Sequence, residues 1–175
     1  MPVWNRKDTV QQCLQSLCGC MGNWELICVD DGSTDGTDEW LSHQKITFSR
    51  NDGEPGIANC MNIGAKHARG RYVCKLDSDV LINRPDWMPV AIEALDKFPR
   101  AGIVSFFVQP IKERMKRIQR GKTRLLVPKS NLNGACLFMT RHVCNRIGPF
   151  WQGQRRYGYV DADYCLRAKM AGYHT

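Results

Sequence analysis

The chain has 175 residues, enough for one domain that buries a sizeable core. Hydrophobic residues make up 43% and charged residues 24%, as in an ordinary globular protein. No apolar stretch of the sequence is long enough to span a bilayer, and we expect no signal peptide. The net charge of +8 indicates an anionic partner, such as nucleotide phosphates, nucleic acid or an anionic membrane surface. A solvated basic face would give the same charge.

Local patterns of apolar residues, turn formers and glycines predict the elements. In chain order they are a helix over 8–18 capped by Asp8, a strand over 26–29, a short helix around 40–41, a strand over 46–48, a helix over 57–68, a strand over 72–76, a helix from 85 to 98, a strand over 102–108, a strand over 133–139 entered through a tight turn, a helix over 142–147 and a helix over 161–171. Strands that alternate with helices predict an α/β fold with a mainly parallel central sheet flanked by helices.

Two acidic loops follow predicted strands. Asp30 and Asp31 come after the strand at 26–29, and Asp77 and Asp79 come after the strand at 72–76. Ligands of parallel sheets gather at the carboxyl ends of the strands, so both loops are candidates for one site. Taken alone, Asp77-Ser78-Asp79 is better explained as a turn than as a divalent cation site.

Two other interpretations of these loops fail. A calcium-binding loop that starts at Asp31 would need a bidentate Glu where Ser42 stands. No glycine-rich phosphate-binding signature occurs anywhere in the chain.

Residues 109–130 interrupt the alternation. This segment is rich in Lys and Arg and poor in apolar residues, and we interpret it as a basic insertion or flexible segment. It could lie over the site, meet an acidic acceptor or membrane, or be a plain solvated insertion. It lacks the aromatic residues that stack on bases, so we expect no nucleic-acid partner.

The nine cysteines are scattered and include no Cys-x-x-Cys pair. This pattern supports neither a zinc site nor a disulfide framework. A reducing, cytosolic compartment is the better interpretation.

Five motifs together resemble those of family 2 glycosyltransferases of the GT-A fold, the nucleotide-diphospho-sugar transferase fold, and they extend over nearly the whole chain. They are Pro2-Val3-Trp4-Asn5-Arg6, Val29 to Asp35, Asn62-Ile63-Gly64-Ala65, Leu76-Asp77-Ser78-Asp79 and Asp161 to Arg167. The resemblance implies an inverting, metal-dependent hexosyl- or hexosaminyltransferase that uses a nucleotide-diphosphate sugar, Mn²⁺ or Mg²⁺, and a glycan or lipid-linked acceptor in surface glycan or polysaccharide synthesis.

The resemblance also implies roles for single residues. The nucleotide-sugar-binding residues would be Pro2, Val3, Asn5, Asp30, Asp31, Asp77 and Ser78, with Asp31 at the base. Asp79, aided by Asp77, would hold the metal, and Asp161 would be the catalytic base. General chemistry agrees, because a divalent ion offsets the charge of a leaving diphosphate and an inverting displacement needs a carboxylate to take the acceptor's proton. Without the other motifs, Asp161 and Asp163 would be a helix cap and a first-turn acid.

The chain departs from the family pattern at Met61, where the family often has Arg, and at Val160, where it often has Glu. It also looks cut short at both ends of the single domain that we expect over 1–175. A catalytically weak nucleotide-sugar-binding or scaffold domain is therefore the alternative. We expect the protein in the cytoplasm, at the inner face of the membrane if it makes peripheral membrane contact.

Overall fold

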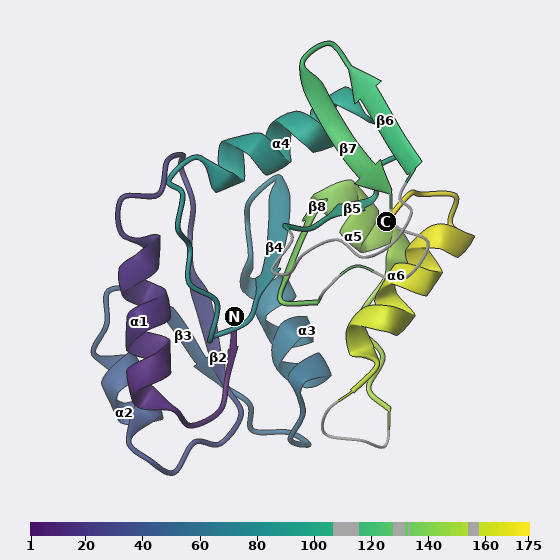
Figure 1. The fold of residues 1–175 in the computed structure, drawn as a ribbon. Helices are drawn as coiled ribbons and strands as arrows, with labels where there is room; N and C mark the ends of the chain where they lie inside the picture. The colour runs from purple at the N-terminus through teal and green to yellow at the C-terminus, as the bar shows by residue number, and fades with distance from the viewer. Residues whose placement is uncertain (107–115, 128–131, 133, 154–157) are drawn as a thin grey trace.

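The computed structural model describes residues 1–106, 116–127, 132, 134–153 and 158–175. Its elements in chain order are β1 (Pro2–Val3), α1 (Lys7–Leu17), β2 (Ile27–Asp30), α2 (Thr37–Ser42), β3 (Thr47–Arg50), α3 (Ile57–His67), β4 (Tyr72–Leu76), α4 (Trp87–Lys97), β5 (Ile103–Val104), β6 (Lys116–Arg120), β7 (Thr123–Val127), β8 (Cys136–Thr140), α5 (Arg141–Ile147) and α6 (Val160–Met170). All the predicted helices are present, with ends shifted by a few residues (Figure 1).

The strands form two three-stranded sheets and a hairpin. β1, β2 and β3 lie side by side and are parallel, with Val3 opposite Asp30 and Asp30 opposite Arg50. β8 lies between β4 and β5 and is antiparallel to both, with Leu76 opposite Cys136. The α/β class is confirmed, and the parallel arrangement that we expected holds for β1–β3. β8 is the exception: it follows the β6–β7 hairpin in the chain and runs antiparallel to both of its neighbours.

Two smaller expectations are corrected. Asp8 does not cap α1; it lies in the first turn, and the cap position is Arg6 in the left-handed conformation. The strand expected over 102–108 is short, because β5 covers only Ile103–Val104, and residues 107–108 lie outside the described part of the chain.

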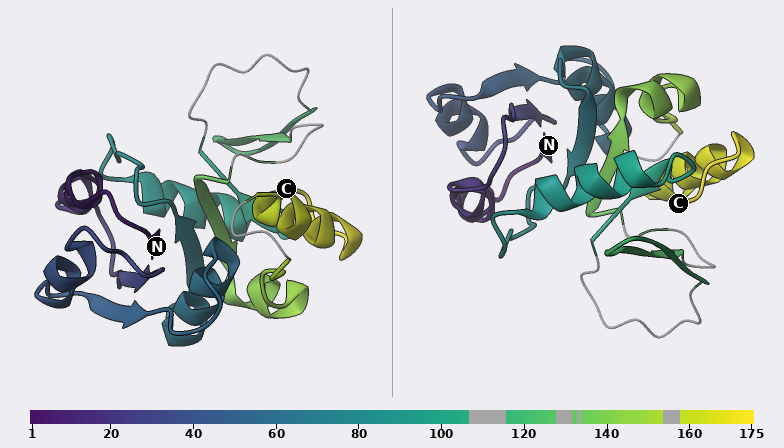
Figure 2. Two further views of the ribbon diagram at one scale, coloured as in Figure 1. Left: turned by 90° about the horizontal axis from the view of Figure 1, so that it is seen from below. Right: turned by 90° about the horizontal axis from the view of Figure 1, so that it is seen from above.

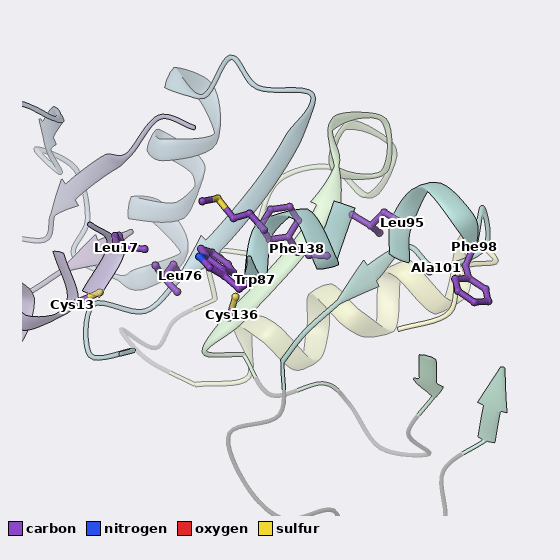
Figure 3. Close-up of a cluster of buried hydrophobic side chains, with 11 residues drawn as sticks. Cys13, Leu17, Leu76, Trp87, Leu95, Phe98, Ala101, Cys136 and Phe138 are labelled. Carbon is purple, nitrogen blue, oxygen red and sulfur yellow. The ribbon is translucent and has the colours of Figure 1, made fainter. Parts of the chain in front are cut away.

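A core of buried side chains joins α4 to the second sheet (Figure 3). Trp87 is its centre: the indole ring meets the Phe138 ring edge-on at a centroid distance of 5.7 Å and the Phe106 ring at 6.1 Å. Leu76, the last residue of β4, is buried in the same cluster. The residue just before the acidic loop is therefore anchored in the core, and the start of the loop is placed rigidly.

A second core packs α6 and α5 against β8 and α3. The Phe150 and Tyr164 rings stack with centroids 3.9 Å apart. The Asn62 side chain links α3 to the same region, because it donates to the Phe150 carbonyl at 2.9 Å and accepts from the Phe150 amide at 2.8 Å. These contacts fix the start of α6 relative to the sheets.

The basic segment that we expected over 109–130 contains a β-hairpin, β6–β7, while residues 109–115 and 128–130 lie outside the described part. Ile118 and Leu125 face each other across the hairpin and pack against the Trp87 core, which explains why it is ordered. Figure 2 shows the hairpin projecting from one side of the molecule, away from α1–α3 and β1–β3.

Candidate functional site

A cavity of about 620 Å³ opens where β1, β2 and β4 end. Both acidic loops contribute to it, as their positions after the strands predict. The residues that line it are Pro2, Val3, Trp4, Asn5, Arg6, Asp31, Ile57, Asp77, Ser78 and Asp79. Of the nine site residues predicted from the sequence, this cavity brings together all except Asp30 and Asp161.

The loop after β1 is held in an uncommon backbone conformation. Asn5 and Arg6 have φ angles of 56° and 63°, in the left-handed region that non-glycine residues rarely occupy. Contacts with the loop after β2 hold this turn in place: the Asn5 amide donates to Ser33 Oγ at 2.7 Å, and Asn5 Oδ1 accepts from the Thr34 amide at 2.8 Å. The two loops therefore form one rigid wall of the cavity.

Asp30 and Asp31 are adjacent in the sequence but have different environments. Asp30 is fully buried, and its carboxylate accepts hydrogen bonds from the amides of Gly32 and Ser33, each at 3.0 Å, and from the Ser33 hydroxyl. It shapes the loop and does not line the cavity. Asp31 does line it, and its Oδ1 accepts from Asn51 Nδ2 at 2.7 Å and from the Gly56 amide at 2.9 Å.

The Asp-x-Asp forms the opposite wall. Asp79 is exposed in the cavity, whereas the side chain of Asp77 is 29% exposed and its Oδ1 lies 2.6 Å from the ammonium of Lys75. Burial raises the pKa of Asp77, and the nearby Asp161 and Asp79 carboxylates raise it further, while Lys75 opposes this. The wall thus concentrates negative charge that one ammonium group only partly offsets.

Asp161 lies in the first turn of α6, outside the residues that line the cavity, but it is connected to them. Its Oδ1 is 3.5 Å from the same Lys75 ammonium that pairs with Asp77. Asp163 has another role, because both Arg167 Nε and Nη2 contact its Oδ2, at 2.9 and 2.8 Å. Of the two acids in this turn, Asp161 faces the acidic loop and Asp163 is engaged within the helix.

Three residues that hold the acidic side chains of the site in place were not predicted from the sequence. Asn51 and Gly56 position Asp31, and Lys75 joins Asp77 to Asp161. The sequence did mark Lys75 as unusual, because it is a charged residue in an otherwise apolar strand, and it stands two residues before Asp77, a spacing that puts both side chains on one side of an extended chain. No local sequence pattern indicated a role in the site for Asn51, because an Asn at this position is equally typical of an ordinary turn.

The residues fit a divalent cation that is shared with a phosphorylated ligand. Within the described ranges, no group of three or more His, Cys, Asp and Glu side chains could hold a metal ion by itself. Mg²⁺ and similar ions, however, bind to enzymes through one or two carboxylates and complete their coordination with water and substrate phosphates. Asp79 and Asp77 supply such a pair; burial raises the pKa of Asp77, and the neighbouring Asp161 and Asp79 carboxylates, whose negative charge a cation would offset, raise it further.

A second cavity, of about 600 Å³, lies between the two sheets, toward the starts of β2 and β4. Apolar side chains such as Leu26, Trp87 and Phe138 dominate its lining. It lacks the convergent carboxylates and backbone turns of the first cavity, so we place the candidate site in the first.

The chain resembles characterised proteins over part of their length. It is 34% identical over 90 residues to the poly(ribitol-phosphate) beta-glucosyltransferase of Bacillus spizizenii, a match that covers 45% of this chain and 14% of that protein. It is 35% identical over 83 residues to the UDP-Glc:alpha-D-GlcNAc-diphosphoundecaprenol beta-1,3-glucosyltransferase WfgD of Escherichia coli, covering 45% of this chain and 33% of that protein.

Among solved structures, the mannosyltransferase PcManGT from Pyrobaculum calidifontis, in complex with GDP-Man and Mn²⁺, matches with a TM-score of 0.72. The sequences are 20% identical, and the match covers 99% of this chain and 51% of that one, so it shows a shared fold. The chain spans only about half of that structure and a third or less of the two relatives.

The family model of Glycosyl transferase family 2 matches residues 1–156, most of the chain. The chain therefore belongs to glycosyl transferase family 2 and has the GT-A fold.

Proposed function

We propose that the domain is a metal-dependent, inverting glycosyltransferase that moves a hexosyl or hexosaminyl group from a nucleotide-diphosphate sugar to an acceptor hydroxyl. The observation that carries this proposal is the convergence of Asp31, Asp77 and Asp79 on one cavity, with Asp161 joined to Asp77 through Lys75. Family membership supports the reaction class.

The nucleotide would bind along the wall formed by the loops after β1 and β2. Pro2, Val3 and Asn5 present this wall, and Asp31 offers its carboxylate to a base N–H. Asp30 would contribute indirectly by holding the loop, since its oxygens are occupied by Gly32 and Ser33. Ser78, between the two acids, would contact the ribose together with Asp77.

Mn²⁺ or Mg²⁺ would be held by Asp79, which is exposed in the cavity, with help from Asp77. A bound divalent cation supplies charge that stabilises a diphosphate leaving group. The neighbouring structure with GDP-Man and Mn²⁺ is consistent with this pairing of donor and metal.

Asp161 would act as the base. Its carboxylate takes the proton of the acceptor hydroxyl while that oxygen bonds to the anomeric carbon and the nucleoside diphosphate leaves from the opposite face, which inverts the configuration. This carboxylate lies in the first turn of α6, near the positive end of the helix dipole. Its side chain is 32% exposed, so an acceptor can reach it.

The acceptor would be a glycan or lipid-linked intermediate that carries phosphate. The two relatives named above act, by their names, on poly(ribitol phosphate) and on a diphosphoundecaprenol-linked sugar, both rich in phosphate. The outward face of the β6–β7 hairpin carries Arg117 and Arg124, and Lys122 lies in the turn between the strands; all three residues are exposed and basic. We propose that this face meets the anionic inner surface of the membrane where such an acceptor resides. No helix in the described ranges has both the length and the apolar character needed to cross a bilayer.

The test is calorimetry with UDP-, GDP- and dTDP-sugars, each with and without Mn²⁺ or Mg²⁺, followed by assays of transfer and of donor hydrolysis. We expect one donor class to bind only when the metal is present and to turn over. If no donor shows metal-dependent binding, the proposal is wrong. Metal-dependent binding without transfer or hydrolysis would instead favour the weakly catalytic donor-binding domain.

A further inference from the structure

Lys75 is a buried charge in the middle of the candidate site. It lies on β4, and its side chain is only 3% exposed. A buried ammonium is costly unless it is paired and hydrogen-bonded. Here it contacts Asp77 Oδ1 at 2.6 Å and Asp161 Oδ1 at 3.5 Å, and it donates a hydrogen bond to the Gly134 carbonyl.

These partners come from three separate parts of the chain. Asp77 follows β4, Gly134 precedes β8, and Asp161 begins α6. A single ammonium group therefore joins the strand that carries the Asp-x-Asp to the helix that carries the proposed base. No other described contact joins the Asp77 and Asp161 carboxylates.

The Asp161 carboxylate has little freedom in this position. Its Oδ1 is buried and accepts no hydrogen bond within the described part of the chain, so the Lys75 ammonium is the charge that compensates it. On its other side is Gly134, where a Cβ atom would overlap the carboxylate. The absence of a side chain at 134 lets the backbone approach, and the carboxylate is held between Gly134 and Lys75.

We propose that Lys75 is a positioning residue that holds the Asp77 and Asp161 carboxylates at a fixed distance from each other. The proposed base, Asp161, and the acid beside the proposed metal site, Asp77, would then already be in position before the donor binds. This inference rests on the roles assigned to those two acids above. Lys75 itself does not line the cavity and would act only through the two carboxylates. Without its charge, the like charges of Asp77 and Asp161 would repel each other and α6 would lose its link to the acidic loop.

The pairing can be tested by thermal unfolding, independently of catalysis. We compare Lys75→Met, Asp161→Asn and the double variant in a double-mutant cycle. Lys75→Met should lower Tm, because it leaves two carboxylates close together without their cation. Adding Asp161→Asn should recover at least about 2 °C of that loss, since it removes one of the two charges. Additive changes in Tm would overturn the pairing of Lys75 with Asp161.

The positioning role is tested by steady-state kinetics with whichever nucleotide sugar the calorimetry shows to be the donor. We expect Lys75→Met to lower kcat on the order of 100-fold while KM for the donor changes less than about threefold, because small misplacements of a catalytic group have effects of this size. Lys75→Arg, which keeps the charge, should recover part of kcat. The matched control is Lys45→Met, which removes an exposed ammonium group outside the cavity and should leave kcat unchanged.

Gly134→Ala is a second variant that keeps Lys75 in place. Its added methyl group should displace the Asp161 carboxylate and lower kcat with little change in metal-dependent donor binding. Unchanged kcat in both Lys75→Met and Gly134→Ala would overturn the positioning role. If the wild-type protein transfers no sugar at all, the proposed function fails, while the unfolding cycle still decides whether Lys75 pairs with Asp161.

Discussion

Asp77 and Asp79 lie two residues apart and differ in exposure. Asp77 is half-buried and pairs with Lys75, whereas Asp79 is exposed in the cavity. A metal ion that came with a phosphorylated donor would bind more readily to Asp79, because that carboxylate needs no desolvation and breaks no ion pair. This difference makes Asp79 the better candidate for direct metal contact.

We therefore expect Asp79→Ala to weaken Mn²⁺-dependent donor binding about tenfold or more, since an interaction with a charged group contributes about 1.5–3 kcal/mol. Calorimetry with and without the metal measures this. Asp52→Ala removes an exposed carboxylate outside the cavity and should bind donor like the wild type. Equal metal-dependent binding by Asp79→Ala would remove Asp79 from the metal site.

Asp161 and Asp163 share a helical turn, and their contacts separate them. Asp161→Asn should reduce transfer about 10²–10⁴-fold, the usual contribution of a general base, with donor binding nearly unchanged. Asp163→Asn should lose only the ion pair with Arg167 and keep transfer within about threefold of the wild type. Steady-state rates and donor affinities measure both. Native transfer by Asp161→Asn would show that the base is another group.

At the scale of elements, the site depends on how α3, α5 and α6 are joined to the sheets. Arg141, the first residue of α5, makes the clearest of these connections, because it links α5 to the end of α3 and to the residues that follow it. Its guanidinium donates to the carbonyls of Ala65 at 3.2 Å, of Ala68 at 2.8 Å and of Gly70 at 2.9 Å. It thereby satisfies the carbonyls at the end of α3, which the helix itself leaves without donors.

Arg141→Met should destabilise the fold by about 1–3 kcal/mol, because these partly buried carbonyls would lose their donors. In thermal unfolding this corresponds to a fall in Tm of roughly 2–4 °C for each kcal/mol. Arg146→Met, at an exposed position of the same helix, is the control and should change Tm little. Similar melting temperatures for the two variants would contradict the role of Arg141.

At the scale of the whole molecule, the net charge of +8 is unevenly arranged. The cavity wall around Asp77 and Asp79 is acidic, while the β6–β7 hairpin is basic. One side of the hairpin packs against the Trp87 core through Ile118 and Leu125. The Thr123 hydroxyl also forms hydrogen bonds with Glu93 and Lys97 of α4, so the strands that carry the basic residues are held in place. Such a surface should bind anionic lipid in a salt-dependent way.

A triple variant, Arg117→Glu with Lys122→Glu and Arg124→Glu, should lose binding to vesicles that contain phosphatidylglycerol, since each basic residue near such a surface contributes about 1 kcal/mol. Co-sedimentation at low and high salt measures this. The control reverses Lys45, Lys66 and Arg146, which gives the same net charge at exposed positions elsewhere. Equal loss in both variants would mean that total charge, and not the hairpin, drives binding.

The sequence by itself determined the elements and the family. Apolar periodicity is a local property, so it predicted α1, α3, β4 and α6 to within a few residues. It also placed the two acidic pairs at the carboxyl ends of β2 and β4, where the structure has them, although Asp30 is the last residue of β2 and not part of the loop. The ordered motifs predicted the glycosyltransferase family, which the family match over residues 1–156 confirms.

Only the tertiary structure decided how these parts meet. The antiparallel position of β8 depends on pairing between distant segments, and no periodicity encodes which strand lies beside which. The different environments of Asp30 and Asp31 depend on which hydrogen-bond donors surround each carboxylate. The contact of Lys75 with Asp161 likewise joins residues far apart in the chain, so it exists only once β4 and α6 have packed against the same core.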